Sequence, residues 1–316
     1  MSTPVPERPS VQSRALASLM MSSVRPLGDV LRRPIGSHLR LARQACDRLG
    51  MFQLPSRTRV RPLSAHGLRG QWVIARNARS SQGAMLYLHG GGFVFGSPVF
   101  YRRLAAQLSA ASGMPVLVLD YRLAPEHPFP AAADDAIAAY RWLLGDGYRP
   151  ERLVIAGDSA GGHLVAGLLA DIARGKLPMP AAAAMLSPFL DLTGEQLDER
   201  DRARRDPFVP PDYARACAKA YAGAGGISQK RLNVLKVRKR GWPPILIQVG
   251  DTECLLGDSQ RMADSLCAAG VPCELQVWPG QVHVFHWFTP FVPEATAAIR
   301  YAGEFLRSAG EQRAAA

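Results

Sequence analysis

The stretch from residue 154 to residue 164 constrains the fold more than any other part of the sequence. It begins with three apolar residues, passes through Gly-Asp-Ser-Ala-Gly at positions 157–161, and continues as a helix-forming segment. Small residues on both sides of Ser159 permit a sharp bend, which lifts the serine hydroxyl above the end of a strand. The free N–H groups of the following helix N-terminus can stabilise negative charge there. The pattern predicts a strand, a tight turn carrying a reactive serine, and a helix.

Two further motifs accompany this turn. Residues 89–93 read His-Gly-Gly-Gly-Phe, and residues 121–126 read Tyr-Arg-Leu-Ala-Pro-Glu. Together the three motifs resemble those of the hormone-sensitive-lipase branch of the α/β-hydrolases, a branch with bacterial carboxylesterases, acetyl hydrolases and monoterpene ε-lactone hydrolases. The resemblance extends from about Leu86 to Arg307. It implies that residues 89–93 form the loop that binds the oxyanion, whereas we interpret residues 121–126 as a structural turn.

A serine hydroxyl needs a histidine to take its proton and a carboxylate to hold that histidine. In the α/β-hydrolases these residues follow one another in the order serine, acid, histidine. The family pattern of glycine, two variable residues and histidine fits Gly280 and His283. We therefore predict His283 as the base, His286 as a packing residue or a supporting group, and His163 as structural.

The acid is expected in the loop after the apolar strand at residues 244–249. The family pattern Gly-x-x-Asp-x-Leu, counted from Gly250, places Glu253 where an aspartate is usual. Glu253 is thus the predicted acid and Asp251 the alternative. Asp258 is interpreted as the N-cap of a helix that begins near Ser259.

The tetrahedral intermediate of acyl transfer requires preorganised hydrogen-bond donors. We predict that these are the backbone N–H groups of Gly91, Gly92 and Ala160. His89 is expected to brace this loop, and Asp158 to bond to local backbone. The residues predicted to line the acyl pocket are Phe93, Val94, Phe95, Phe208 and Tyr213. This chemistry implies no metal and no organic cofactor.

Strand and helix patterns alternate along the chain, which predicts an α/β fold with a mostly parallel sheet covered by helices on both faces. The expected strands are residues 71–75, 84–89, 115–120, 152–156, 182–186, 244–249 and 274–278. The expected helices are residues 100–112, 132–144, 161–174, 256–269 and 293–308.

Two segments do not fit this alternation and are predicted to form a helical lid. The first is residues 1–55, a helical arm that begins with a mobile segment at 1–13. Its amphipathic pattern at 27–49 is interrupted by Pro34. Residues 192–236 form the second, an insertion with a helix around 213–221. The hydrolase core then comprises residues 56–191 and 237–316.

The net charge of +12 raises the question of an anionic partner. Its densest cluster, residues 236–240, is too short to indicate nucleic-acid binding and is interpreted as an exposed loop. Five cysteines without a C-x-x-C pair argue against disulfides and zinc and favour a reducing compartment. No apolar run approaches the ~18 residues of a membrane span and no signal peptide is evident, so we expect a cytoplasmic protein without membrane insertion, with a homodimer as the candidate assembly.

The predicted function is hydrolysis of carboxylic esters of short to medium acyl chain, through an acyl-enzyme on Ser159. A lactone hydrolase would use the same triad, with the leaving alcohol still attached to the acyl group. A binding protein on the same fold, like the plant gibberellin receptors, is the alternative of another class. Such receptors have lost the catalytic histidine, whereas this chain has His283.

Overall fold

The computed structural model describes residues 5–26, 39–51 and 57–315. Its centre is an eight-stranded sheet in the order β1-β2-β4-β3-β5-β6-β7-β8. Strand β2 runs antiparallel to both of its neighbours, β1 and β4, and all other pairs are parallel. The strands are β1 Arg59–Ala65, β2 Leu68–Ile74, β3 Ala84–Leu88, β4 Val116–Leu119, β5 Leu153–Asp158, β6 Ala182–Leu186, β7 Ile245–Gly250 and β8 Cys273–Trp278. The predicted mostly parallel sheet is confirmed.

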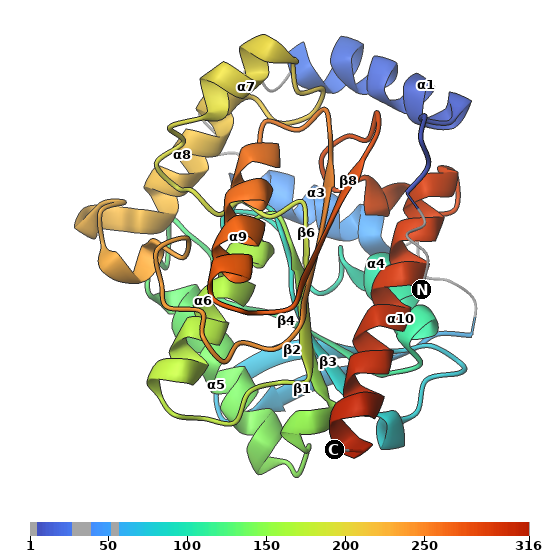
Figure 1. Ribbon diagram of the computed structural model, residues 1–316, viewed down its shortest axis with the longest axis vertical. Coiled ribbons are helices and arrows are strands. Elements are labelled where there is room, and N and C mark those ends of the chain that lie inside the picture. Colours follow the sequence, from blue (N-terminus) through green and yellow to red (C-terminus); the bar gives the residue numbers. More distant parts are fainter. Residues whose placement is uncertain (1–4, 27–38, 52–56, 316) are drawn as a thin grey trace.

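Helices cover both faces of this sheet (Figure 1). On one face α4 (Arg102–Ser112) packs against α10 (Pro293–Ala315), and their apolar residues form one core with those of the strands. On the other face α5 (Ala131–Gly145), α6 (Ala160–Arg174) and α9 (Leu256–Ala268) contribute to the larger core. Central strands such as β3 and β5 are buried along their whole length, which explains their continuous apolar sequences.

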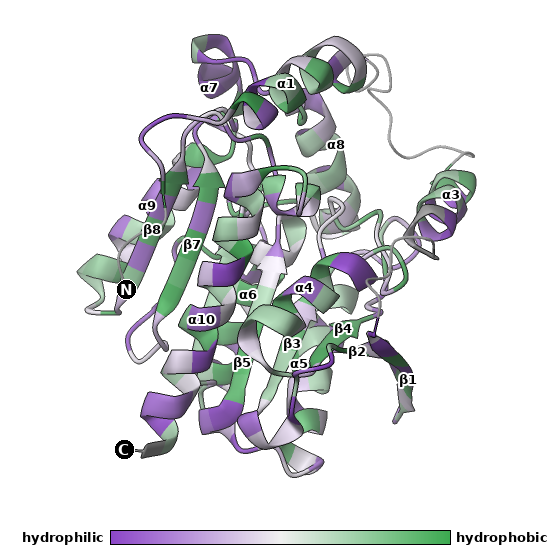
Figure 2. Ribbon diagram, turned by 90° about the vertical axis from the view of Figure 1, so that its right-hand side faces the viewer, coloured by the Kyte–Doolittle hydropathy of each residue, from purple (hydrophilic) through white to green (hydrophobic). Residues whose placement is uncertain are grey.

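Parts of both segments predicted to lie outside the core lie at one end of the molecule, beyond the ends of the strands. There α1 (Val11–Leu19) lies near α7 (Leu197–Ala203) and α8 (Pro211–Ala222), as Figures 1 and 2 both show. A π-helical turn, Met20–Val24, continues α1, and α3 spans Leu39–Met51. Pro34 and the first half of the predicted helix at 27–49 lie outside the described residues.

Two expectations from the sequence were wrong. Strand β1 was missed because only Leu63 is buried in it, so its exposed arginines give no apolar alternation. The segment preceding α1 was expected to be mobile, yet the N–H of Ser10 donates to Glu294 on α10 at 2.6 Å. The basic cluster at 236–240 is a loop in which Lys236, Arg238 and Arg240 are exposed, as predicted. Lys239 is the exception within it: its side chain is buried, and its ammonium group donates to the carbonyls of Leu235 and Val237.

Candidate active site

Ser159 lies at the sharp turn between β5 and α6. Its backbone has φ 51° and ψ −120°, a region that non-glycine residues rarely adopt. Only small neighbours allow this bend, because a Cβ atom on Gly161 would lie 1.9 Å from the carbonyl oxygen of Leu88. The strained turn projects the serine side chain away from the sheet. Backbone strain of this kind is common at functional sites.

A continuous hydrogen-bonded relay connects Ser159 to an acid. The hydroxyl oxygen of Ser159 lies 2.9 Å from Nε2 of His283, and Nδ1 of the same ring lies 2.8 Å from Oε2 of Glu253. Glu253 follows β7 and His283 follows β8, so neighbouring strands place the two residues on adjacent loops. Both side chains are buried. The structure thus brings together the three residues that the sequence predicted to act as one unit.

The other carboxylate oxygen of Glu253 is held from two sides. Ser187 donates its hydroxyl to Oε1 at 2.7 Å, and the N–H of Gly250 donates to the same atom at 2.6 Å. Ser187, with φ 47°, follows β6 and also accepts the N–H of Val284 at 3.1 Å, so it connects the acid loop to the histidine loop. Ser187 was not predicted from the sequence, where its position directly after β6 was the only available signal.

Free backbone donors face the same region. Within the described part of the chain, the N–H groups of Gly91, Gly92 and Ala160 make no hydrogen bond. Gly91 and Gly92 have φ values of 103° and 61°, which favour glycine. Side chains would also clash there, since a Cβ on Gly92 would lie 2.7 Å from Sγ of Cys217.

A cavity of about 540 Å³ opens beside Ser159 and His283. Phe95, Phe208 and Tyr213 line it, as predicted. Phe93 and Val94 do not, so this part of the pocket prediction is wrong: both are buried in the main core, and the Phe93 ring stacks on Tyr221 at 3.8 Å. Several apolar lining residues were not predicted from the sequence, including Val24, Cys46, Phe100, Val209, Trp287 and Phe288.

The family model of the α/β-hydrolase fold matches residues 85–287. The chain belongs to the α/β-hydrolase family. An acetyl-hydrolase of Streptomyces hygroscopicus is 40% identical over 76% of this chain and 79% of its own length. The carboxylesterase/phospholipase LipF of Mycobacterium tuberculosis is 38% identical over 95% of this chain and 83% of its own length.

Solved structures give the same family. A bacterial esterase of the hormone-sensitive lipase family superposes with a TM-score of 0.84 and 36% identity, covering 95% of this chain and 98% of that one. EstE5, soaked with p-nitrophenyl butyrate, superposes with a TM-score of 0.86 and 36% identity, over 96% and 99% of the chains. The predicted membership of the hormone-sensitive-lipase branch is confirmed.

The electrostatics of this α/β-hydrolase site favour a charged form of His283. Burial alone would lower the pKa of the His283 imidazole, but the hydrogen bond and negative charge of Glu253, helped by Asp206 and Asp158, raise it above the usual 6.5. A raised pKa makes the ring a stronger base towards the Ser159 hydroxyl.

The other two candidate acids have different partners. The carboxylate of Asp251 accepts the N–H of Gly280 at 2.7 Å and pairs with Arg204 at 2.6 Å. Asp258 is not an N-cap, contrary to the prediction, because α9 begins at Leu256 and Asp258 lies in its first turn. One of its carboxylate oxygens instead accepts the N–H groups of residues 190 and 191, both at 2.8 Å.

Three more histidines of the hydrolase are buried and neutral. Burial lowers the pKa of His89 and of His163 to about 4, and that of His286 to about 3. Nε2 of His286 lies 3.0 Å from Oε1 of Gln248, and its ring packs on Phe285 with ring centres 4.1 Å apart. His89 stacks on Tyr121 with ring centres 4.2 Å apart and braces its loop, as predicted.

Asp158 bonds to the loop at residues 89–93 rather than to local backbone, so that prediction was wrong. It accepts the N–H of Gly90 at 2.9 Å and the hydroxyls of Tyr87 and Tyr101 at 2.7 and 2.8 Å. Burial raises the pKa of Asp158 to about 6, although these three donors counteract the shift. The residue beside Ser159 therefore fixes the start of the glycine loop, residues 89–93.

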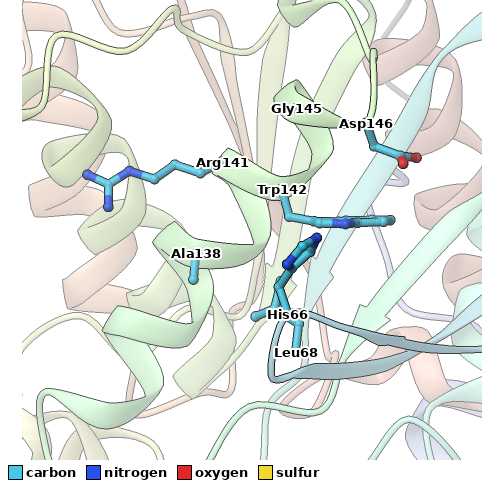
Figure 3. Close-up of a pocket in the computed structure, with 7 residues that line it drawn as sticks. All are labelled: His66, Leu68, Ala138, Arg141, Trp142, Gly145 and Asp146. Atoms are coloured by element: carbon cyan, nitrogen blue, oxygen red, sulfur yellow. The ribbon is translucent and has the colours of Figure 1, made fainter.

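The hydrolase has a second hollow, of about 480 Å³, between the β1–β2 turn and α5. Figure 3 shows the rings of His66 and Trp142 next to each other there, with Arg141 extended away from them. It shares no lining residue with the cavity at Ser159. Among the described residues there is no group of His, Cys, Asp and Glu suited to a metal ion, and no helix long and apolar enough to span a membrane.

Proposed function

We propose that this protein is a serine carboxylesterase with Ser159 as nucleophile, His283 as general base and Glu253 as the acid that orients the histidine. The observation that carries the proposal is the relay from the Ser159 hydroxyl through both nitrogens of His283 to Glu253, with distances of 2.9 and 2.8 Å. Hydrolysis of esters is also the activity in the names of the relatives.

In the first half-reaction, Oγ of Ser159 attacks the ester carbonyl carbon while its proton passes to Nε2 of His283. The carbonyl electron pair moves onto oxygen, where the N–H groups of Gly91, Gly92 and Ala160 stabilise the negative charge. Collapse of this intermediate expels the alkoxide, which takes the proton from His283. Water, deprotonated by His283, then attacks the acyl-enzyme and releases the carboxylic acid and Ser159.

The cavity supports a preference for short to medium acyl chains. Its volume is about 540 Å³, and its walls include residues of the arm and of the insertion, such as Cys46 and Tyr213. We propose that residues 1–55 and 192–236 together act as a lid over the site. Arg25 links them, because its guanidinium group forms an ion pair with Asp201 at 2.8 Å.

A substrate profile tests the proposed function. With p-nitrophenyl esters of two to sixteen acyl carbons, we expect kcat/KM to be highest at short to medium lengths and to fall steeply for the longest chains, which exceed the cavity. Monoterpene-type ε-lactones measured in parallel test the lactone alternative. Tight binding without turnover of any ester or lactone would contradict the proposal and favour a receptor.

The raised pKa of His283 gives a pH prediction. Only the neutral imidazole accepts the serine proton, so kcat/KM should fall as the pH decreases through the pKa of His283 in the free enzyme. Because this pKa is raised, the midpoint should lie above 6.5 for an ester that does not ionise. Protonation of Asp158 at about pH 6 should steepen the loss below that point. A midpoint well below 6.5 would contradict this assignment.

The location and the assembly of the protein remain expectations from the sequence. We propose a cytoplasmic protein that acts on a small ester or lactone and does not bind nucleic acid, with a homodimer as the candidate assembly.

A further inference from the structure

Helix α3 of the arm contacts the glycine loop directly through Arg43. The Nε atom of Arg43 donates to the carbonyl oxygen of Val94 at 2.8 Å, and its Nη2 donates to the carbonyl of Ala124, also at 2.8 Å. One guanidinium group therefore joins the loop that follows Gly91 and Gly92 to the turn at residues 121–126. A rigid planar fork is suited to hold two acceptors in a fixed geometry.

The turn at 121–126 is itself bonded to the glycine loop. The N–H of Ala124 donates to the carbonyl of Phe93 at 3.0 Å, and the hydroxyl of Tyr121 donates to the carbonyl of His89 at 2.7 Å. The turn thus contacts both ends of the segment that contains Gly91 and Gly92. Residues 121–126 take no part in the catalytic steps and instead support the loop that contains Gly91 and Gly92.

Two more residues on the same side of α3 reach the continuation of the loop. Asp47, one turn after Arg43, accepts a hydrogen bond from the hydroxyl of Ser97. Gly50 approaches the backbone so closely that a Cβ atom there would lie 2.6 Å from the carbonyl oxygen of Val99. Spacings of four and three residues place these positions on one helix face. Along that face, α3 follows the loop from residue 94 to residue 99.

We propose that Arg43 is a positioning residue for catalysis, which sets the direction of the Gly91 and Gly92 N–H groups by holding the carbonyls of Val94 and Ala124. The proposal rests on the proposed function, because it requires these N–H groups to bind the oxyanion. Donors of this kind act through preorganisation, so a small rotation of the loop should affect the transition state more than the bound ester.

The ion pair between Arg43 and Glu126 offers a simpler explanation, a surface contact that only stabilises the fold. Nη1 of Arg43 lies 2.9 Å from Oε1 of Glu126, whose side chain is 42% exposed. Exposed pairs of this kind contribute little. The carbonyl contacts and the ion pair can be separated experimentally, because Glu126→Gln removes the charge and leaves both carbonyl contacts of Arg43 in place.

The test compares Arg43→Ala, Arg43→Lys and Glu126→Gln, with Arg48→Ala as a matched control for an exposed arginine on α3. Each variant is assayed for kcat and KM on the best p-nitrophenyl ester. Each is also titrated with an alkyl trifluoromethyl ketone, which forms a tetrahedral adduct with the serine, and with the matching non-fluorinated ketone as a ground-state analogue. Ser159→Ala is measured alongside.

For Arg43→Ala we expect kcat to fall and the Ki of the trifluoromethyl ketone to rise, both by about 10- to 100-fold, less than the ~10²- to 10³-fold loss for a deleted oxyanion donor. KM and the Ki of the plain ketone should stay within about threefold. Arg43→Lys should be intermediate, and it provides the test if Arg43→Ala does not fold. Glu126→Gln and Arg48→Ala should resemble the wild type.

Three results would overturn the inference. The first is an Arg43→Ala variant with wild-type kcat and wild-type affinity for the trifluoromethyl ketone, while Ser159→Ala is inactive. The second is an equal loss of affinity for both ketones, which would mean that the pocket has lost its cover. The third is a Glu126→Gln variant as impaired as Arg43→Ala. Failure of the proposed function is distinct, because then Ser159→Ala would remain active.

Discussion

Replacing Ser159 with alanine is expected to lower kcat for any ester substrate by at least about a thousandfold, because no nucleophile remains. Within the described residues, the Ser159 hydroxyl is the only group hydrogen-bonded to Nε2 of His283. Alanine differs from serine by one oxygen atom and is compatible with the same backbone, so the strained turn should persist. The expected residual rate is that provided by the oxyanion donors and substrate binding.

The control for Ser159→Ala is a measurement of ligand affinity and stability rather than of a reaction rate. The variant should unfold at nearly the wild-type temperature and should bind the plain ketone with nearly wild-type affinity, since the cavity is unchanged. Its affinity for the trifluoromethyl ketone should fall by orders of magnitude, because no adduct can form. A variant that retains more than about a tenth of the wild-type kcat would show that the nucleophile lies elsewhere.

The strands that are buried on both faces of the sheet were predictable from the sequence. Strands β3 and β5 are continuous apolar runs because helices cover them on both sides, and their expected bounds were close to the observed ones. Strand β1 was not predictable in this way. It pairs with β2 at the edge of the sheet, and its sequence, Arg-Val-Arg-Pro-Leu-Ser-Ala, carries exposed arginines and a proline. Pairing with β2 determines the conformation of this segment.

The site was predictable where chemistry requires a residue type in a local motif. Gly91, Gly92 and Ser159 belong to such motifs, because close backbone approach and strained dihedrals restrict their neighbours. The direction of a side chain is a different matter. Phe93 follows the glycines directly, yet its ring packs on Tyr221, which comes from α8 and is remote in sequence. Only the packed structure could show that Phe93 does not face the cavity.

The parts of the site that could not be predicted are contacts between segments that are distant in the sequence. Ser187 supports Glu253 across two strand ends, and Arg43 reaches the glycine loop from the arm. Neither residue lies in a recognisable motif, because each acts on a partner more than fifty residues away in the sequence. Such supporting residues are determined by the fold, whereas the groups that perform chemistry are restricted by the reaction itself.

The second large effect is expected for Glu253→Gln, which should lower kcat by roughly 10²- to 10⁴-fold. In the proposed mechanism the acid has two functions: it accepts a hydrogen bond from the Nδ1–H of His283, which leaves Nε2 unprotonated and free to take the serine proton, and its charge stabilises the imidazolium. Glutamine retains the shape of the side chain. With its carbonyl oxygen held by Ser187 and Gly250, it would present an amide N–H to Nδ1 and favour the wrong tautomer.

Asp251→Asn is the matched comparison, since it removes a carboxylate two residues away with the same change of chemistry. Asparagine can still accept the N–H of Gly280, and the lost partner, Arg204, forms a half-exposed ion pair of small energetic weight. We expect its kcat to remain within about tenfold of the wild type. Both variants should be measured on one ester, together with their pH profiles, because removing the Glu253 charge should also shift the His283 midpoint to lower pH. A severe loss in Asp251→Asn with a mild one in Glu253→Gln would reverse the assignment of the acid.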